Sequence, residues 1–392
     1  MVMPMPYFDH NATAPLHPFA RDAWLDAYET GWQNPGGPYR SGARVHVRLD
    51  DARERLADIL GGHPDRIVFT SGATESNNAV IASMATGATP DDVISVSPTE
   101  HPSVVEAAVR CWADRVVKLR VDRFGRIDEE YLAEVLASRR PRLVCIMAAN
   151  NETGVLAPIK RLVDLCHEAG SPMLCDATQW IGKLSTDSLS GVDFLTGCGH
   201  KFGAPKGVGF IRIPSDGAAF SWVQGGDQEK GHRAGTENYP SVEAMVSLLA
   251  HLADTSLQFS EDREEMKREF EGQLVSMLPG TQVVGLGSKR LWNTVSVIMH
   301  SGENMRWVRK LDCLGYDIST GSACATGSDA PSHVLAAMGL SATEARRTIR
   351  ISSGWETGKT GWKGLLEGML KVSTDQASGP IVSVVNPGGR DR

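Results

Sequence analysis

The sequence predicts an α/β protein: helices covering a mainly parallel sheet, with a smaller α+β unit towards the C-terminus. Seven short apolar runs alternate with helical stretches between Arg66 and Ile213, a pattern typical of parallel sheets. After about Ala250 the pattern changes to a long polar helix and further strand-like runs. With 392 residues, 41% of them hydrophobic, the chain is long enough for one large core and a second, smaller one.

Several of the seven runs end in small or polar residues. The runs are RIVFT, DVISVS, VVKLRV, RLVCIMA, PMLCDA, VDFLTG and VGFIRI. Small or polar residues follow at 70–72, 150–151, 176 and 197–201. In open α/β sheets, ligands bind at the carboxyl ends of the strands. We therefore expect these segments to meet at one site.

The second unit opens with the polar segment SEDREEMKREFEGQLVSML at 260–278. Its apolar residues recur at helical spacing and its first turn is acidic, which predicts an amphipathic helix with Met266, Phe270, Leu274 and Leu278 on one face. The runs NTVSVIM and TIRISSG, the turn STGSACATGS and a helix from about Ser332 complete this unit. The tail is broken by Pro and Gly, so no regular structure is predicted there.

Charge and cysteine content exclude several functions. The net charge is −7 and like charges do not cluster, so nucleic acid is not an expected partner. We find no signal-peptide pattern and no run of about 18 apolar residues, and expect a soluble, cytoplasmic protein that does not enter a membrane. The seven cysteines form no CxxC pair, which argues against disulfides or zinc. We predict reduced thiols and no metal.

A carboxylate and a lysine lie in two motifs that a strand and a turn connect, DATQW at 176–180 and GHKFG at 199–203. Enzymes that use pyridoxal 5'-phosphate (PLP) need such a pair: a lysine that holds the cofactor as a Schiff base, and a carboxylate that keeps the ring nitrogen protonated. Lys201 and Asp176 are the candidates. Taken singly, a solvated lysine and a helix-capping aspartate are simpler interpretations. Their spacing and their position at strand ends favour the cofactor site.

Two further segments fit the phosphate and the ring of such a cofactor. FTSGATESNN reads as a strand, a turn and a helix N-terminus, where backbone N–H groups and the Thr74 and Ser76 hydroxyls can bind phosphate. An ordinary helix cap explains this segment about equally well. His101 in EHPSV follows another strand, where its imidazole can lie on a ring and move protons near neutral pH. A lone histidine, however, is more often structural.

Together the motifs resemble one family closely. NATAP, SGATESNN, EHPSV, NNETG, DATQ, GHKFGAPKGVG, GGDQEKGHRAGTEN, GSAC and RISSG occur in the order and spacing of the cysteine desulfurases of the NifS/IscS type. The resemblance implies the fold-type I architecture of PLP enzymes, with a mixed seven-stranded sheet, and a homodimer with active sites at its interface. It implies a large domain over 16–255, a small domain from 1–15 and 256–375, and a tail at 376–392.

The resemblance also implies how PLP is held. Lys201 would bind the cofactor, Asp176 would pair with its ring nitrogen, His101 would stack on the ring and Gln179 would donate to the ring oxygen. Asn151 would stand between the ring oxygen and the substrate carboxylate. The implied phosphate contacts are the Ala73 backbone, Thr74, Cys198, His200 and, across the dimer, Thr236.

Two residues of the second unit would define the substrate and the reaction. Arg350 in RISSG matches the family's carboxylate-binding arginine, and its guanidinium fork suits a free amino acid. A structural salt bridge is the alternative for this arginine. Cys324 in GSAC lies among glycines and small polar residues, which favours a loop that brings a thiolate to the sulfur of L-cysteine. The products would be alanine and a Cys324 persulfide, passed to an acceptor or scaffold protein for iron–sulfur cluster assembly or other sulfur transfer.

Four positions depart from the family pattern. Cys198 stands where a serine usually helps to hold the phosphate. Because a thiol is a weaker donor than a hydroxyl, we expect weaker cofactor retention. Tyr39 replaces a histidine, and Asp227 and Lys230 replace a glycine and an arginine. These three changes leave the expected catalytic set intact.

Two other functions remain open from the sequence. One is another PLP enzyme of the same fold, such as a selenocysteine lyase, a cysteine lyase or an aminotransferase, which would work without Cys324. The other is a non-catalytic sulfur carrier that docks a partner. The presence of Lys201, Asp176, His101 and Arg350 argues against a carrier, because a scaffold does not need a complete cofactor site.

Overall fold

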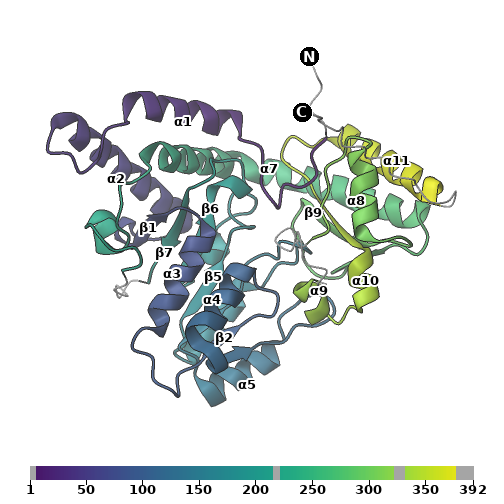
Figure 1. Ribbon diagram of the computed structural model, residues 1–392, viewed down its shortest axis with the longest axis horizontal. Helices are drawn as coiled ribbons and strands as arrows, with labels where there is room; N and C mark the ends of the chain where they lie inside the picture. The colour runs from purple at the N-terminus through teal and green to yellow at the C-terminus, as the bar shows by residue number, and fades with distance from the viewer. Residues whose placement is uncertain (1–5, 215–220, 322–331, 377–392) are drawn as a thin grey trace, which may run out of the picture.

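The larger of two sheets has seven strands, and its edge-to-edge order is β1-β7-β6-β5-β4-β2-β3 (Figure 1). The computed structural model describes residues 6–214, 221–321 and 332–376. β7 runs antiparallel to both neighbours and all other pairs are parallel, which confirms the mixed, mainly parallel sheet. The strands are β1 Ile67–Thr70, β2 Ile94–Val96, β3 Val116–Lys118, β4 Leu143–Cys145, β5 Met173–Asp176, β6 Phe194–Cys198 and β7 Gly209–Arg212.

Helices cover both faces of this sheet because successive strand side chains point to opposite faces. Val68 and Leu174 pack against one layer, made by α3 Ala73–Ala85 and α4 Pro102–Trp112. The next residue of each strand, Phe69 and Cys175, belongs to the core on the other face. That face is covered by α2 Arg40–Leu60, α5 Glu129–Arg139, α6 Ile159–Glu168 and the first part of α7.

The second unit is built on a three-stranded antiparallel sheet in the order β10-β9-β8. Its strands are β8 Gln282–Val283, β9 Thr294–Ile298 and β10 Thr348–Ser352, and its helices are α8 Asn304–Asp312, α9 His333–Ala337, α10 Ala342–Arg347 and α11 Lys359–Gln376. Phe270, Leu274 and Leu278 are buried in its core, which confirms the predicted apolar face. Helix α11 was not predicted from the sequence.

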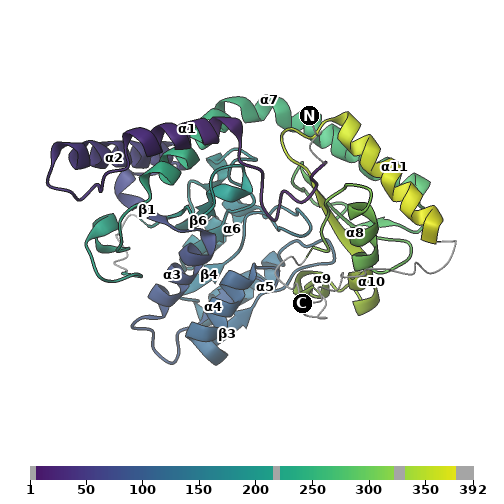
Figure 2. The ribbon, with the colours of Figure 1, turned by 45° about the horizontal axis from the view of Figure 1, so that its top comes forward.

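One continuous helix, α7 Tyr239–Met277, belongs to both cores. Its first half packs on the large sheet beside α1 Pro18–Thr30, and its second half lies against α11 (Figure 2). The domain limit expected at residue 255 therefore falls inside a helix rather than in a loop. Among the residues that the structure describes, no helix is both long and apolar enough to cross a membrane.

The N-terminal segment connects the two units a second time. Tyr7 and Asp9 form β-bridges with Asp317 and Ser352 of the second unit. A few residues later, the Ala14 amide donates to the His200 carbonyl of the large unit at 2.8 Å. Residues 7–14 therefore cross from one unit to the other.

Candidate active site

A cavity of about 990 Å³ lies where the strands of the large sheet end, next to β10 and the N-terminal segment. It confirms that the polar strand ends meet at one place. Cys324 lies outside the described residues, and Thr236 lines a different cavity together with Trp24, Tyr28 and Trp32. The predicted residues that line the large cavity are Ala73, Thr74, His101, Asn151, Asp176, Gln179, Cys198, His200, Lys201 and Arg350.

Asp176 is the last residue of β5 and is buried. Its Oδ1 accepts from the Thr178 amide at 2.9 Å, and its Oδ2 accepts from Asn77 Nδ2 at 2.8 Å. Asn77 is itself fixed, because its Oδ1 accepts from the Thr196 hydroxyl at 2.6 Å. The carboxylate is thus held in one orientation at the end of its strand, where it can pair with a cationic ring nitrogen.

Lys201 ends the short 3₁₀ turn Gly199–Lys201 that follows β6. Its Nζ donates to the carbonyl oxygens of Asn11 at 2.9 Å and Ala12 at 2.7 Å. Both carbonyls belong to the N-terminal segment, so this segment positions the amine at the cavity. The sequence did not predict these contacts, although Asn11 and Ala12 lie in the NATAP motif.

His101 caps helix α4. Its Nδ1 accepts from the Ser103 amide at 3.1 Å and lies 2.8 Å from the Ser103 hydroxyl. An acceptor Nδ1 means that the neutral ring carries its hydrogen on Nε2. Burial lowers the pKa of His101; Asp176 opposes this shift and the Lys201 charge adds to it. The imidazole is therefore neutral at pH 7 and presents an N–H donor.

Helix α3 begins at Ala73, and Gly72 before it offers no side chain to cap the first amides. Ala73 and Thr74 line the cavity, so these amides and the Thr74 hydroxyl fit a phosphate group. The expectation for Ser76 was wrong. Its hydroxyl is buried and hydrogen-bonds with the Thr70 hydroxyl at 2.8 Å and the Phe210 carbonyl at 3.1 Å, because position 76 faces the sheet.

Cys198 and His200 also line the cavity, and the Ala73 amide is hydrogen-bonded to Cys198. Burial raises the pKa of Cys198 to about 11, although the nearby Lys201 charge and the Ala73 amide lower it. The group is therefore a neutral thiol. Burial and Lys201 lower the pKa of His200 to about 4, and its Nδ1 lies 3.1 Å from the Thr13 hydroxyl. A neutral imidazole here can still donate one hydrogen to a phosphate.

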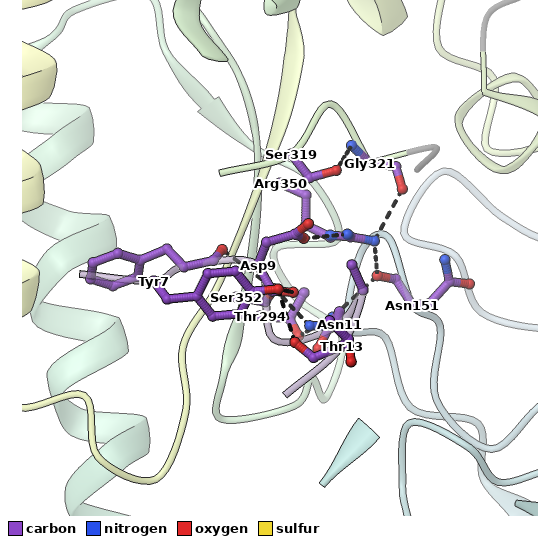
Figure 3. Close-up of polar contacts among 12 residues, drawn as sticks. Tyr7, Asp9, Asn11, Thr13, Asn151, Thr294, Ser319, Gly321, Arg350 and Ser352 are labelled. Carbon is purple, nitrogen blue, oxygen red and sulfur yellow. Dashed lines mark hydrogen bonds and ion pairs between the residues drawn. The ribbon is translucent and has the colours of Figure 1, made fainter. Parts of the chain in front are cut away.

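Arg350 lies on β10, is buried and lines the cavity. Its Nη1 donates to the carbonyls of Asn151 and Gly321, both at 3.0 Å, and its Nη2 donates to Asp9 Oδ1 at 2.6 Å (Figure 3). Of its five hydrogens, those on Nε and one on Nη2 have no acceptor among the described residues. Two spare donors on a buried guanidinium suit the carboxylate of an amino acid.

Three of the positions that depart from the family pattern, Tyr39, Asp227 and Lys230, do not line this cavity. Tyr39 is exposed at the start of α2, and Asp227 precedes the turn Gln228–Gly231. Lys230 forms an ion pair with Asp65.

Sequence reasoning missed Asp9, Asn11 and Lys183, which contact the predicted residues. Asn11 lies within NATAP; Asp9 and Lys183 carried no signal of their own.

Comparisons with known proteins agree with this geometry. The family model "Aminotransferase class-V" matches residues 6–359. A protein named cysteine desulfurase from Gluconacetobacter diazotrophicus is 35% identical over 88% of both chains. An IscS-like cysteine desulfurase from Mycobacterium tuberculosis is 33% identical over 89% of this chain and 91% of its own.

Solved structures show the same fold over most of the chain. One, of a NifS-like protein, superposes with a TM-score of 0.87 at 27% identity, covering 95% of this chain and all of its own. Another, of SspA in complex with cysteine, has a TM-score of 0.76 at 28% identity, covering 88% and 98%. Solved structures therefore share the fold of this chain.

The cavity fits the PLP on which enzymes of this family depend. Asp176 offers a buried carboxylate for the ring nitrogen, Lys201 an amine, and the start of α3 backbone amides and the Thr74 hydroxyl for the phosphate. The described residues include no cluster of His, Cys, Asp or Glu that could hold a metal ion. The chain belongs to the aminotransferase class-V family of PLP-dependent enzymes and, within it, to the cysteine desulfurases of the NifS/IscS type.

Proposed function

We propose that this enzyme takes the sulfur of L-cysteine, releases alanine and leaves a persulfide on Cys324. The observation that carries the proposal is one cavity that combines a lysine amine, a fixed carboxylate and an arginine with two spare donors. The lysine amine and the carboxylate would bind the cofactor, and the arginine would bind the carboxylate of a free amino acid. The structural relative SspA, solved in complex with cysteine, supports L-cysteine as the substrate.

At the cofactor end, each residue has one role in the proposal. Bound PLP supplies a ring that accepts the electrons released when a bond at the substrate Cα breaks. Lys201 Nζ would hold the cofactor and would be the base for the Cα proton. Asp176 keeps the ring nitrogen protonated. His101 presents its Nε2–H, a donor that stabilises an anionic substrate sulfur.

At the substrate end, Arg350 binds the α-carboxylate through Nε and Nη2. The carbonyls of Asn151 and Gly321 hold the guanidinium from the opposite side. The Cys324 thiolate then attacks the substrate sulfur. A sulfur–sulfur bond forms, the carbon–sulfur bond breaks, and its electron pair stays with the carbon, which takes up a proton to become the methyl group of alanine. The persulfide is passed to a thiol or scaffold protein for iron–sulfur cluster assembly or another sulfur pathway.

We propose a homodimer formed through α1. Large apolar side chains are exposed along and beside this helix: Leu16, Phe19, Leu25, Tyr28 and Trp32. Thr236 lines the aromatic cavity on this face, which supports its role at the partner's cofactor phosphate. Sedimentation velocity should show a dimer for the wild type and a monomer for Tyr28→Glu. A wild-type monomer would contradict the proposal.

Domain limits and location are also proposals. We propose a large domain over 16–255 and a small domain from 1–15 and 256–375, supported by the two cores that α7 joins. The place of Phe8 in the smaller core supports assigning the N-terminus to that domain. We propose a cytoplasmic location, supported by the six free cysteines of the described residues.

The test of function is a spectrum followed by product analysis. Purified protein should be yellow, and borohydride should fix PLP on the Lys201 peptide. One turnover with L-cysteine without reductant should give about one alanine per subunit and one added sulfur on the Cys324 peptide. Cys324→Ala should lose both products. Alanine formation unchanged in that variant would favour a lyase, a keto acid product an aminotransferase, and a colourless protein that takes up no PLP a sulfur carrier.

A further inference from the structure

We propose that Lys183 is a positioning residue that fixes the side-chain amide of Gln179, so that the amide N–H faces the cofactor cavity. The inference rests on the proposed function, because it gives a reason for the direction in which Gln179 donates. Lys183 itself does not line the cavity.

Lys183 lies in the turn after β5 and is buried. Its Nζ donates to Gln179 Oε1 at 2.5 Å and to Asn11 Oδ1 at 3.2 Å. Gln179 lines the cavity, and the Asn11 carbonyl accepts from Lys201 Nζ. The buried lysine therefore contacts Gln179, which lines the cavity, and Asn11, which binds the Lys201 amine.

A glutamine amide can be turned by exchanging its oxygen and nitrogen, and its neighbours decide which end faces the cavity. An ammonium group has no acceptor, so Lys183 selects the oxygen of Gln179. The Gln179 Nε2 then donates to the Asn11 carbonyl at 2.9 Å, which also excludes the turned amide. Exchange would leave two buried hydrogen bonds unmade.

The charged lysine selects the Gln179 oxygen most strongly. Burial, together with the charges of Lys201 and Arg350, lowers the pKa of Lys183 to about 7. A neutral amine still donates two hydrogens, and the side chains of Gln179 and Asn11 each accept one, but its lone pair can also accept. When the lysine is neutral, the Asn11 carbonyl, which accepts from Gln179 Nε2 and cannot donate, therefore keeps the same orientation of the amide.

The second Nε2 hydrogen of Gln179 has no acceptor in the described part of the chain, which leaves it for a ligand. A donor beside the oxygen of the cofactor ring favours the anionic form of that oxygen. The proton that the oxygen shares with the lysine-linked nitrogen then leaves at lower pH. Without the fixed donor, the pH at which the visible band of the bound cofactor titrates should rise by about one unit.

The experiment is a pH titration of that band in holoenzyme without substrate. Lys183→Met should raise the midpoint by about one unit, and Lys183→Arg, which keeps a donor without an acceptor, should return it towards the wild type. Lys267→Met is the matched control: Lys267 is a buried lysine that donates to the Leu291 carbonyl at 2.8 Å and does not line the cavity. Its midpoint should equal that of the wild type.

A double-mutant cycle separates positioning from general destabilisation. Gln179→Ala should raise the midpoint as Lys183→Met does, and the double variant should show no further rise, because both changes remove the same donor. Additive shifts, or an unchanged midpoint in Lys183→Met, would overturn the proposal.

A variant that does not fold also gives a result. If Lys183→Met does not fold, Lys183→Gln replaces it. The new amide can both donate and accept, so it no longer fixes the Gln179 oxygen towards position 183. An unchanged midpoint again overturns the proposal. Failure of both variants to fold would assign Lys183 to stability alone and would also overturn it. A wild type without a visible band would instead refute the proposed function.

Discussion

Asp9 Oδ1 lies 2.6 Å from Arg350 Nη2, so the arginine proposed to bind substrate already has a carboxylate partner within the chain. Arg350 is buried, whereas one fifth of the Asp9 side chain is exposed. Breaking a buried ion pair leaves an uncompensated charge. The Asn151 and Gly321 carbonyls keep the guanidinium in place without Asp9. The pair therefore stabilises the ligand-free enzyme more than it shapes the binding site.

The first prediction follows from this balance. Asp9→Asn should lower the free energy of unfolding of ligand-free holoenzyme by about 1–3 kcal/mol, because a charge-assisted hydrogen bond becomes a neutral one. L-alanine, whose carboxylate restores the missing charge, should stabilise this variant more than it stabilises the wild type. Urea unfolding with and without L-alanine measures both effects. Equal stabilisation of the two proteins would show that Arg350 does not bind the carboxylate.

The second prediction concerns Asp176, which is proposed to keep the cofactor ring nitrogen protonated. Asp176→Asn keeps the side-chain shape but cannot hold a proton on the ring nitrogen, so PLP should bind while most of the turnover is lost. The control is Asp193→Asn. Asp193 directly precedes β6 and accepts from the Met173 amide at 2.8 Å. Both residues lie at the opposite end of strands β5 and β6 from Asp176. Bound PLP is measured by absorbance and turnover by alanine release. Near-normal turnover in Asp176→Asn would mean that another carboxylate serves the ring.

Much of the site could be predicted because its residues lie at the ends of strands that the sequence pattern shows. Asp176 and Lys201 each follow a short apolar run, and parallel strands bring their carboxyl ends to one edge. Arg350 comes from a different sheet. Its place at the cavity followed from the family resemblance and not from the pattern of strands.

The rest could not be predicted, for physical reasons. Lys183 stands in IGKLS, where a polar turn residue is normally solvated, and contacts with Asn11 and Trp292, both far away in the sequence, accompany its burial. Asn11 contacts Thr294, which is 283 positions away, and local sequence carries no information on such a contact. Ser76 was misassigned because helix periodicity alone did not show which face of α3 packs on the sheet.

The third prediction tests the departure at Cys198. The residue is buried, lines the cavity and is hydrogen-bonded to the Ala73 amide. Cys198→Ser replaces a weak donor with a hydroxyl, which should tighten PLP binding by about 0.5–1.5 kcal/mol, or roughly 2- to 13-fold in Kd. Equilibrium dialysis of the protein against PLP measures this change. Cys166→Ser, a buried change in α6 that does not line the cavity, should leave Kd unaltered. Weaker binding in Cys198→Ser would show that the thiol fits better than a hydroxyl.

The last prediction links pH to stability through Lys183. Burial lowers the pKa of Lys183 to about 7 in the folded protein, against about 10.5 in the unfolded chain. Between these values the unfolded state binds a proton that the folded state lacks, so stability rises with pH, by about 1.4 kcal/mol per unit. In apoprotein, the difference in free energy of unfolding between the wild type and Lys183→Met should change with that slope from about pH 7 to pH 9. Lys363→Met, at an exposed position of α11, should keep the wild-type pH dependence. A pH-independent difference between the wild type and Lys183→Met would mean that Lys183 keeps its proton when folded.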